Sequence, residues 1–220
     1  EPRIPFGTIV ERGLLPPGSF LPMAERSTLI LDLTEWVLHE ALRQCAEWAS
    51  AGLHIPVSVN LSARMLVFDN LPALVKNSLA AHGLPPDVLT LEITESALVT
   101  QPTRAAAMLR GLRTMGVKLA LDDFGTGYSS MEILKALPFD EVKIDKSFVT
   151  DARGSLPDAA IVRSVLDLGH RLGLRVVGEG VEDARTLRMM AELGCDILQG
   201  DVISPAVPAD RLSEMLTGDG

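Results

Sequence analysis

The chain has 220 residues, of which 47% are hydrophobic, so one barrel-sized domain or two small domains would have enough apolar residues for a core. Its net charge of −9 argues against a protein that wraps a long nucleic acid, because that mode of binding depends on clustered Lys and Arg. Cys45 and Cys195 have neither metal nor disulfide spacing, which favours a cytoplasmic location, and no apolar run approaches the roughly 18 residues that cross a bilayer.

Apolar periodicity predicts helices that alternate with short strands. The predicted helices are 28–51, 71–82, 103–115, 129–137, 158–172, 183–193 and 209–216. The predicted strands are 55–60, 88–93, 118–122, 141–144, 174–178 and 196–199. Such alternation is typical of an α/β fold with a parallel sheet. No linker divides the chain, so we expect one domain over residues 1–220. Because the sequence begins at Glu1 rather than Met, we expect that domain to come from a longer protein, which could be membrane-anchored.

A polar residue stands at the carboxyl end of each predicted strand. These residues are Asn60, Glu92, Asp122, Lys143, Glu179 and Gln199. Active sites of (β/α)₈ barrels are assembled at that rim, so the pattern favours a TIM-type barrel over a doubly wound sheet. Six strands are two short of eight, and we expect the missing pair within residues 1–27, which are poor in strand signals and rich in Pro and Gly.

Four of the rim residues offer hard oxygen ligands. Asn60, Glu92, Asp122 and Asp123 suit Mg²⁺ or Mn²⁺, and two such ions could clamp the attacking and leaving oxygens of a phosphodiester. Adjacent residues of a strand face opposite sides, so Asp122 and Asp123 can share one site only if the strand breaks directly after them, at Phe124 and Gly125.

Two further rim residues suit catalysis by proton transfer and charge neutralisation. Lys143 could position a water or neutralise phosphate charge, and Glu179 could act as a general base.

Each residue also has a structural explanation. Asn60 could cap a turn together with Ser62, and an Asp-Asp pair before Gly is itself a turn signal. Glu95 could be an acid of a helix start. Turn chemistry alone does not readily produce six polar residues at six strand ends, and this coincidence favours a site.

Other motifs are weaker. "DFG" lacks the glycine-rich loop that accompanies it in kinases, and "GTG" is not followed by the third glycine of a dinucleotide fingerprint. The four histidines, His39, His54, His82 and His170, lack metal-ligand spacing along the sequence, so we expect them to be structural or exposed.

Six motifs together resemble one family. "VNLSARML", "LEITESALV", "LALDDFGTGYSS", "FDEVKIDKSFV", "VVGEGVE" and "LGCDILQG" occur in the order and at the intervals of the EAL-domain family. Its members are phosphodiesterases that open cyclic di-GMP to linear pGpG on a modified TIM barrel, using Mg²⁺ or Mn²⁺. The resemblance runs from about residue 11 to residue 216.

The resemblance implies a role for each matching position. Asn60, Glu92, Asp122 and Asp123 would be metal ligands for two ions. Lys143 would orient the nucleophilic water, and Glu179 would be the general base. Glu95 would anchor the loop after Asp123, which the family uses in dimerisation, and Gln199 would support metal water or substrate. A homodimer and an adjoining sensory or GGDEF domain are further implications.

The chain departs from the family pattern at two places. Asp201 replaces an aromatic residue after "QG", and Pro205 replaces a basic one, at positions that contact the ligand in the family. The Glu-Ala-Leu signature itself is missing, and the neighbouring segments meet between Val10 and Glu11. The lost strand would carry the first metal-ligating glutamate. Omission of residues from the sequence is favoured over true deletion, because a barrel without an internal strand exposes unpaired backbone groups.

Three functions follow as hypotheses. The first is a cyclic di-GMP phosphodiesterase. The second is a degenerate domain that binds cyclic di-GMP, or only a protein partner, without hydrolysis. The third and most distant is a metal-dependent barrel enzyme that acts on another phosphoester.

Overall fold

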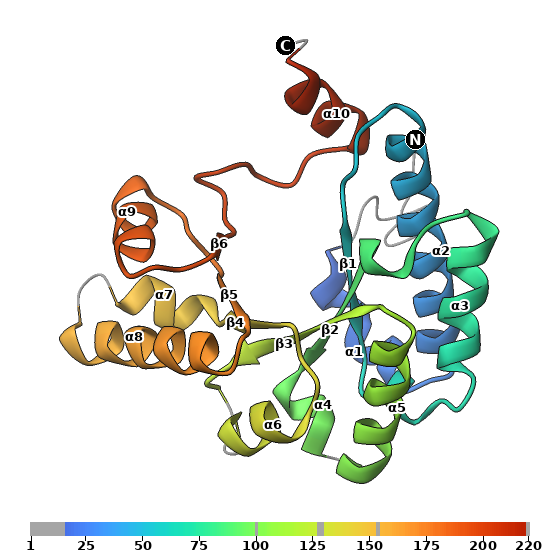
Figure 1. Cartoon of the computed structure of the whole chain (residues 1–220), viewed down its shortest axis with the longest axis horizontal. Helices are drawn as coiled ribbons and strands as arrows, with labels where there is room; N and C mark the ends of the chain where they lie inside the picture. The colour runs from blue at the N-terminus through green and yellow to red at the C-terminus, as the bar shows by residue number, and fades with distance from the viewer. Residues whose placement is uncertain (1–15, 100, 127–129, 153–154, 219–220) are drawn as a thin grey trace.

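Six parallel strands form one curved sheet in a computed structural model that describes residues 16–99, 101–126, 130–152 and 155–218 (Figure 1). The strands are β1 (Val57–Leu61), β2 (Leu89–Thr94), β3 (Lys118–Phe124), β4 (Glu141–Ile144), β5 (Arg175–Gly178) and β6 (Ile197–Leu198). They pair in sequence order, each parallel to the next. Sequential parallel pairing through helical crossovers is the arrangement of a TIM-type barrel, so the predicted fold class is confirmed.

Helices cover the outer side of the sheet (Figure 1). The α-helices are α1 (Leu21–Glu25), α2 (Leu29–Ser50), α3 (Leu71–Ala81), α4 (Glu95–Val99), α5 (Pro102–Thr114), α6 (Ser130–Ala136), α7 (Lys146–Asp151), α8 (Leu156–Arg171), α9 (Ala184–Glu192) and α10 (Ala209–Thr217). The 3₁₀ turns are η1 (Pro17–Ser19), η2 (Met65–Val67) and η3 (Pro86–Val88). No helix in the described part of the chain is both long and apolar enough to cross a membrane.

The sheet is a half-barrel in the described residues, with β1 and β6 as its two edges. The missing strand pair, expected within residues 1–27, does not occur in residues 16–27, where η1 and α1 lie instead. Two prolines, Pro16 and Pro17, start this segment, and proline suits the first turn of a helix because its missing N–H would be unpaired there anyway. Residues 1–15, which include the junction of Val10 and Glu11, lie outside the described residues.

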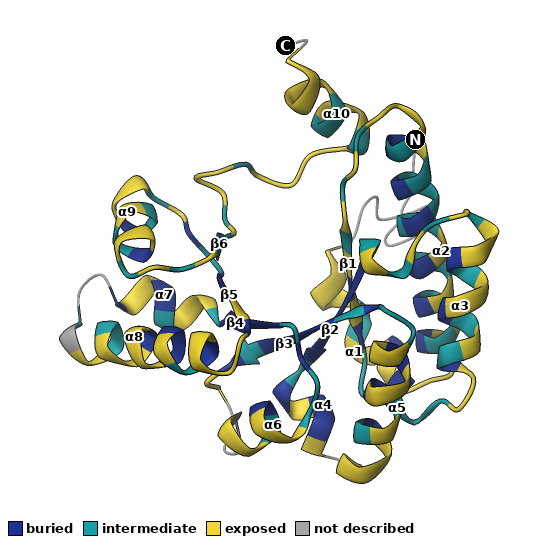
Figure 2. Ribbon diagram, viewed as in Figure 1, coloured by how far each residue is buried: buried dark blue, intermediate teal, exposed yellow. Residues whose placement is uncertain are grey.

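The core lies on both faces of the central strands. Leu119, Leu121, Val142 and Ile144 have no exposed surface, and Figure 2 shows the middle of the sheet as buried. Strands that are covered on both faces have continuous apolar sequences rather than alternating ones, and the central strands of this sheet are of the continuous kind. A polar side chain at the end of such a strand therefore needs a specific partner.

Aspartates pin the strand register at the amino-terminal ends of the sheet. Asp140, just before β4, accepts a hydrogen bond at Oδ2 from the backbone N–H of Leu119 at 3.0 Å. Asp196, just before β6, accepts one from the backbone N–H of Val176 at 2.8 Å. Each backbone N–H of these aspartates in turn donates to the carbonyl of the same neighbour, at 2.9 Å for Asp140 and 3.2 Å for Asp196. Each aspartate therefore holds the neighbouring strand through both its side chain and its backbone N–H, at the end of the sheet opposite the polar rim.

Three short helices were not predicted. α1 precedes α2, and α4 and α7 lie just after β2 and β4; at five or six residues all three are too short to show helical periodicity. α7 does carry a start signal, since the side chain of Asp145 accepts a hydrogen bond from the backbone N–H of Ser147 at 2.9 Å.

Candidate metal centre

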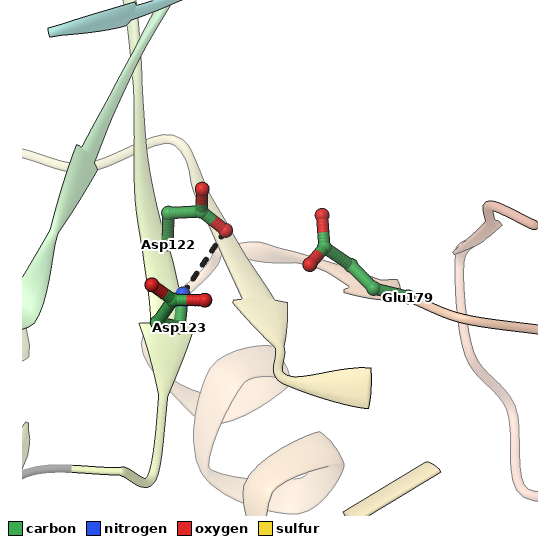
Figure 3. Close-up of side chains that lie close together, drawn as sticks. All are labelled: Asp122, Asp123 and Glu179. Atoms are coloured by element: carbon green, nitrogen blue, oxygen red, sulfur yellow. Dashed lines mark hydrogen bonds between the residues drawn. The ribbon is translucent and has the colours of Figure 1, made fainter. Parts of the chain in front are cut away.

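Three carboxylates meet at the carboxyl ends of β3 and β5. Asp122, Asp123 and Glu179 each offer an oxygen, and these atoms lie within 4.8 Å of one another. Figure 3 shows the two aspartates on one side and Glu179 facing them. Asp122 is buried, and the other two are partly exposed. Such a group of hard oxygen donors fits Mg²⁺ or Mn²⁺ in its chemistry.

A distortion of β3 lets both aspartates face this site. The strand does not end directly after Asp123, as the sequence suggested, but continues to Phe124 with a register shift against β4 between Leu121 and Phe124. Asp123 has φ 55°, the single positive-φ residue other than glycine in the described chain. A bulge with one residue in the left-handed region re-aims the side chain, and such backbone strain is typical of functional sites.

Lys143 joins the carboxylates from β4. Its Nζ lies 2.6 Å from Glu179 Oε1, 2.9 Å from Glu92 Oε2 and 3.6 Å from Asp122 Oδ1. Burial acts to lower the pKa of Lys143, but hydrogen bonds to Glu179 and Glu92 outweigh it, so the pKa lies above its ordinary value. Lys143 is therefore a permanent cation that compensates part of the negative charge.

The remaining negative charge is crowded. Burial raises the pKa of Asp123, and the charges of Asp122 and Asp145 raise it further. Burial also raises the pKa of Glu179, against the opposing effect of Lys143. One lysine does not neutralise this set of acids, so a cation among them would relieve both the repulsion and the cost of burial.

Asn60, Glu92 and Glu95 lie on the neighbouring elements. Asn60 and Glu92 are in register on β1 and β2, where Asn60 is exposed and Glu92 is 7% exposed. Glu92 is bound to Lys143 and falls outside the three-carboxylate group. Glu95 is 2% exposed at the start of α4. The oxygen atoms expected to bind metal thus come from three adjacent strands, with Asn60 and Glu92 toward the β1 edge.

The structure weakens one structural explanation of Asn60. The Oγ atom of Ser62 is buried and has no hydrogen-bond partner among the described residues. The turn after β1, η2, has no side-chain cap. A shared capping role for Asn60 and Ser62 is therefore not supported.

Gln199 is exposed just after β6, and its backbone is fixed on both sides. Its N–H donates to the carbonyl of Gly178 at 2.9 Å, and its carbonyl accepts from the N–H of Val181 at 3.0 Å. The following Gly200 is required by close packing, since a Cβ there would lie 2.2 Å from the carbonyl oxygen of Val181. Asp201 and Pro205 are exposed in the segment that follows.

Sequence reasoning missed the support behind Asp123. Gly125 has φ 101°, and a Cβ there would lie 2.8 Å from the ring of Phe148 on α7. The ring thus packs where only glycine fits, and α7 supports the turn after the aspartates. The "FG" turn was visible in the sequence, but its contact with a residue 23 positions later was not.

Comparisons with known proteins identify the family. The family model described as "EAL domain" matches residues 9–206. The chain is 42% identical over 204 residues to the "Bifunctional diguanylate cyclase/cyclic di-GMP phosphodiesterase MucR" of Pseudomonas aeruginosa, covering 92% of this chain but 30% of that protein. It is 36% identical to "Signaling protein YkoW" of Bacillus subtilis, covering 92% of this chain and 25% of that protein. The chain thus spans about a quarter to a third of these two relatives.

Solved structures agree with this result. The structure described as "PaMucR Phosphodiesterase, c-di-GMP complex" is 42% identical, with a TM-score of 0.87 over 91% of this chain and 81% of that one. The EAL domain of Mycobacterium smegmatis DcpA is 36% identical, with a TM-score of 0.81 over 86% of each chain. Both the sequence and the fold match, and the chain belongs to the EAL domain family.

Proposed function

We propose that this chain binds cyclic di-GMP and hydrolyses it to linear pGpG. The observation that carries the proposal is the group of Asp122, Asp123 and Glu179, bound through Lys143 to Glu92 at the carboxyl rim of an EAL-family sheet. Relatives support the substrate, since MucR is described as a cyclic di-GMP phosphodiesterase and its structure as a complex with that dinucleotide.

In this proposal Asn60, Glu92, Asp122 and Asp123 hold two Mg²⁺ or Mn²⁺ ions. All four offer oxygen atoms, which these ions prefer over nitrogen or sulfur. When bound, the ions would stabilise phosphoryl charge and acidify a water. The crowded carboxylates, two with raised pKa values, fit a cation.

Lys143 and Glu179 are the proposed catalytic pair. The Nζ atom of Lys143 lies 2.6 Å from Oε1 of Glu179, and this contact fixes the orientation of the carboxylate. The other carboxylate oxygen, Oε2, is left to accept a proton. A water adds to phosphorus and its proton passes to Glu179. One phosphodiester P–O bond breaks, and the ribose oxygen that leaves takes up a proton from solvent, which gives the linear product. A glutamate with a raised pKa is a stronger base than an ordinary one, which suits this step.

The other implied features belong to the same proposal. Gln199 supports substrate or metal water, and Glu95 anchors the loop after Asp123. Residues 1–220 act as one domain of a longer cytoplasmic protein that works as a homodimer. The printed name of MucR, which includes a diguanylate cyclase, supports an adjoining GGDEF domain.

Conversion of cyclic di-GMP to pGpG, followed by chromatography, tests the proposal. Turnover should require Mg²⁺ or Mn²⁺ and stop with EDTA. Glu179→Gln should lower the rate at least about 100-fold, since it removes the proton acceptor. Glu182→Gln is the matched control, because Glu182 is exposed three residues further along. No metal-dependent turnover by a folded protein would overturn the assignment.

A receptor without catalysis is the second candidate. Glu92 is engaged by Lys143 instead of grouping with the other acids, and exposed Asp201 and Pro205 replace the residue types that the family uses near its ligand. Calorimetry with cyclic di-GMP and metal separates the candidates. Binding without turnover supports the receptor, and absence of both supports a protein-interaction role.

A further inference from the structure

Two histidines far apart in the sequence meet in the helical layer outside the sheet. His39 lies on α2, and His82 is the C-cap residue directly after α3. The Nδ1 atom of His39 and the Nε2 atom of His82 are 2.7 Å apart, and the ring centroids are 4.7 Å apart. His39 is exposed and His82 is partly exposed, so solvent and small ions can reach them.

A cavity of about 320 Å³ lies between α2 and α3, on the side of His39. Its lining includes His39 together with Glu35, which lies one helical turn earlier on the same face of α2. Asn70 and Asn77 add further polar groups. The cavity therefore brings a carboxylate and amide groups to the side of His39.

We propose that His39 and His82 form a binding site for a transition-metal ion such as Zn²⁺, which ties α2 to α3, with Glu35 as the third protein ligand. Imidazole nitrogen suits Zn²⁺, whereas the acidic rim offers only oxygen and suits Mg²⁺ or Mn²⁺. Two imidazoles and a carboxylate are a known ligand set for zinc.

Small local changes convert the pair into a site. Without metal, one of the two facing nitrogens carries the proton of their hydrogen bond. Moving that proton to the other nitrogen of the same ring leaves two lone pairs that face a shared point, with no net proton release. At Zn–N distances of about 2.0–2.1 Å the nitrogens of a tetrahedral site are about 3.3 Å apart, so the pair must open by about half an ångström.

The ion pairs of the neighbouring residues determine which acidic side chain can become the third metal ligand. Arg43 on α2 already holds Glu40 through a hydrogen bond of 2.7 Å and also contacts Glu47, so these two acids are engaged. Among the described residues, no carboxylate oxygen or cysteine sulfur lies within 4.8 Å of both facing histidine nitrogens. Glu35 must therefore rotate its exposed side chain toward His39.

Titration of the whole chain with ZnCl₂, in saturating MgCl₂ to occupy the acidic rim, tests the site by calorimetry. Loss of a group that merely hydrogen-bonds a metal ligand costs about 10–100-fold in affinity, so His82→Gln should weaken Zn²⁺ binding at least about tenfold. Glu35→Gln should weaken it less. His54→Gln, which removes an exposed histidine before β1, is the control and should bind as the parent does.

Equal Zn²⁺ affinity in His82→Gln and the parent would overturn the proposal, as would absence of Zn²⁺ binding by the parent. X-ray absorption of the Zn²⁺-loaded parent keeps the test valid if the variant does not fold. Nitrogen at about 2.0–2.1 Å with imidazole scattering supports the pair. A shell of oxygen alone refutes it, because that ion would then occupy carboxylates.

Discussion

Replacement of Lys143 by Met tests whether this lysine holds the acidic rim together. The side chain is 6% exposed and its Nζ lies within 3.6 Å of three carboxylates, on Glu92, Asp122 and Glu179. Methionine fills similar volume but leaves these charges without their cation. Breaking a buried ion pair by removing one partner costs about 3–5 kcal/mol.

The lower end of that range applies here. The side chains of Asp122 and Glu179 are 13% and 19% exposed, so water still reaches them. Glu179 also has a raised pKa and can take up a proton once Lys143 is gone. We therefore expect the free energy of unfolding to fall by about 3 kcal/mol without metal at neutral pH, and by less at mildly acidic pH.

Urea unfolding in EDTA measures this loss, with Lys76→Met as the control. Lys76 is exposed on α3, so its replacement should change stability by no more than about 0.5 kcal/mol. Addition of Mg²⁺ should recover part of the loss in Lys143→Met, since the ion supplies the missing positive charge. A loss below about 1 kcal/mol, as for a surface ion pair, would refute the reasoning.

Three further predictions concern stability. Gly200→Ala should lower the free energy of unfolding by about 3 kcal/mol, because its Cβ would lie 2.2 Å from a backbone oxygen. Gly111→Ala, on the exposed face of α5, should instead raise the free energy of unfolding by about 0.5–1 kcal/mol. The midpoints of urea unfolding compare the two variants. The pKa of His82 is lowered in the folded state, so the unfolded state takes up the proton first. The contribution of His82 to the free energy of unfolding should therefore fall as pH drops below 6.5, and this contribution should be absent in His82→Gln. Asp196→Ala leaves a strand N–H unpaired and should lower the thermal midpoint by an amount equivalent to about 1–3 kcal/mol, whereas exposed Asp201→Ala should not.

The sequence predicted the sheet well because its signals are local. The six strands are apolar runs bounded by turn residues, and each prediction overlaps an observed strand. The alternation with helices indicated a parallel sheet, and the polar residues at the strand ends favoured a barrel over a doubly wound sheet. α1, α4 and α7 were missed because helices of this length are set by tertiary packing rather than by periodicity.

The site was predicted in position but not in detail. Six polar residues at strand ends indicated the rim, yet the sequence did not show that Lys143 bridges Glu92 to Glu179, since that depends on side-chain length across three strands. It also missed the bulge that holds Asp123 at φ 55°. The meeting of His39 and His82, 43 residues apart, depends on how α2 packs on α3, which sequence spacing does not reveal.

Asp140 and Asp196 hold strands of this sheet in register at a distance from the polar rim. They lock neighbouring strands at the end opposite the rim, so alignment of the strands does not depend on residues that would handle a ligand. Substitutions at the rim can then accumulate without sliding one strand past another. A protein with this sheet could lose catalysis and keep ligand binding during evolution without losing its fold. This gives a physical reason why an enzyme and a receptor could share the same barrel.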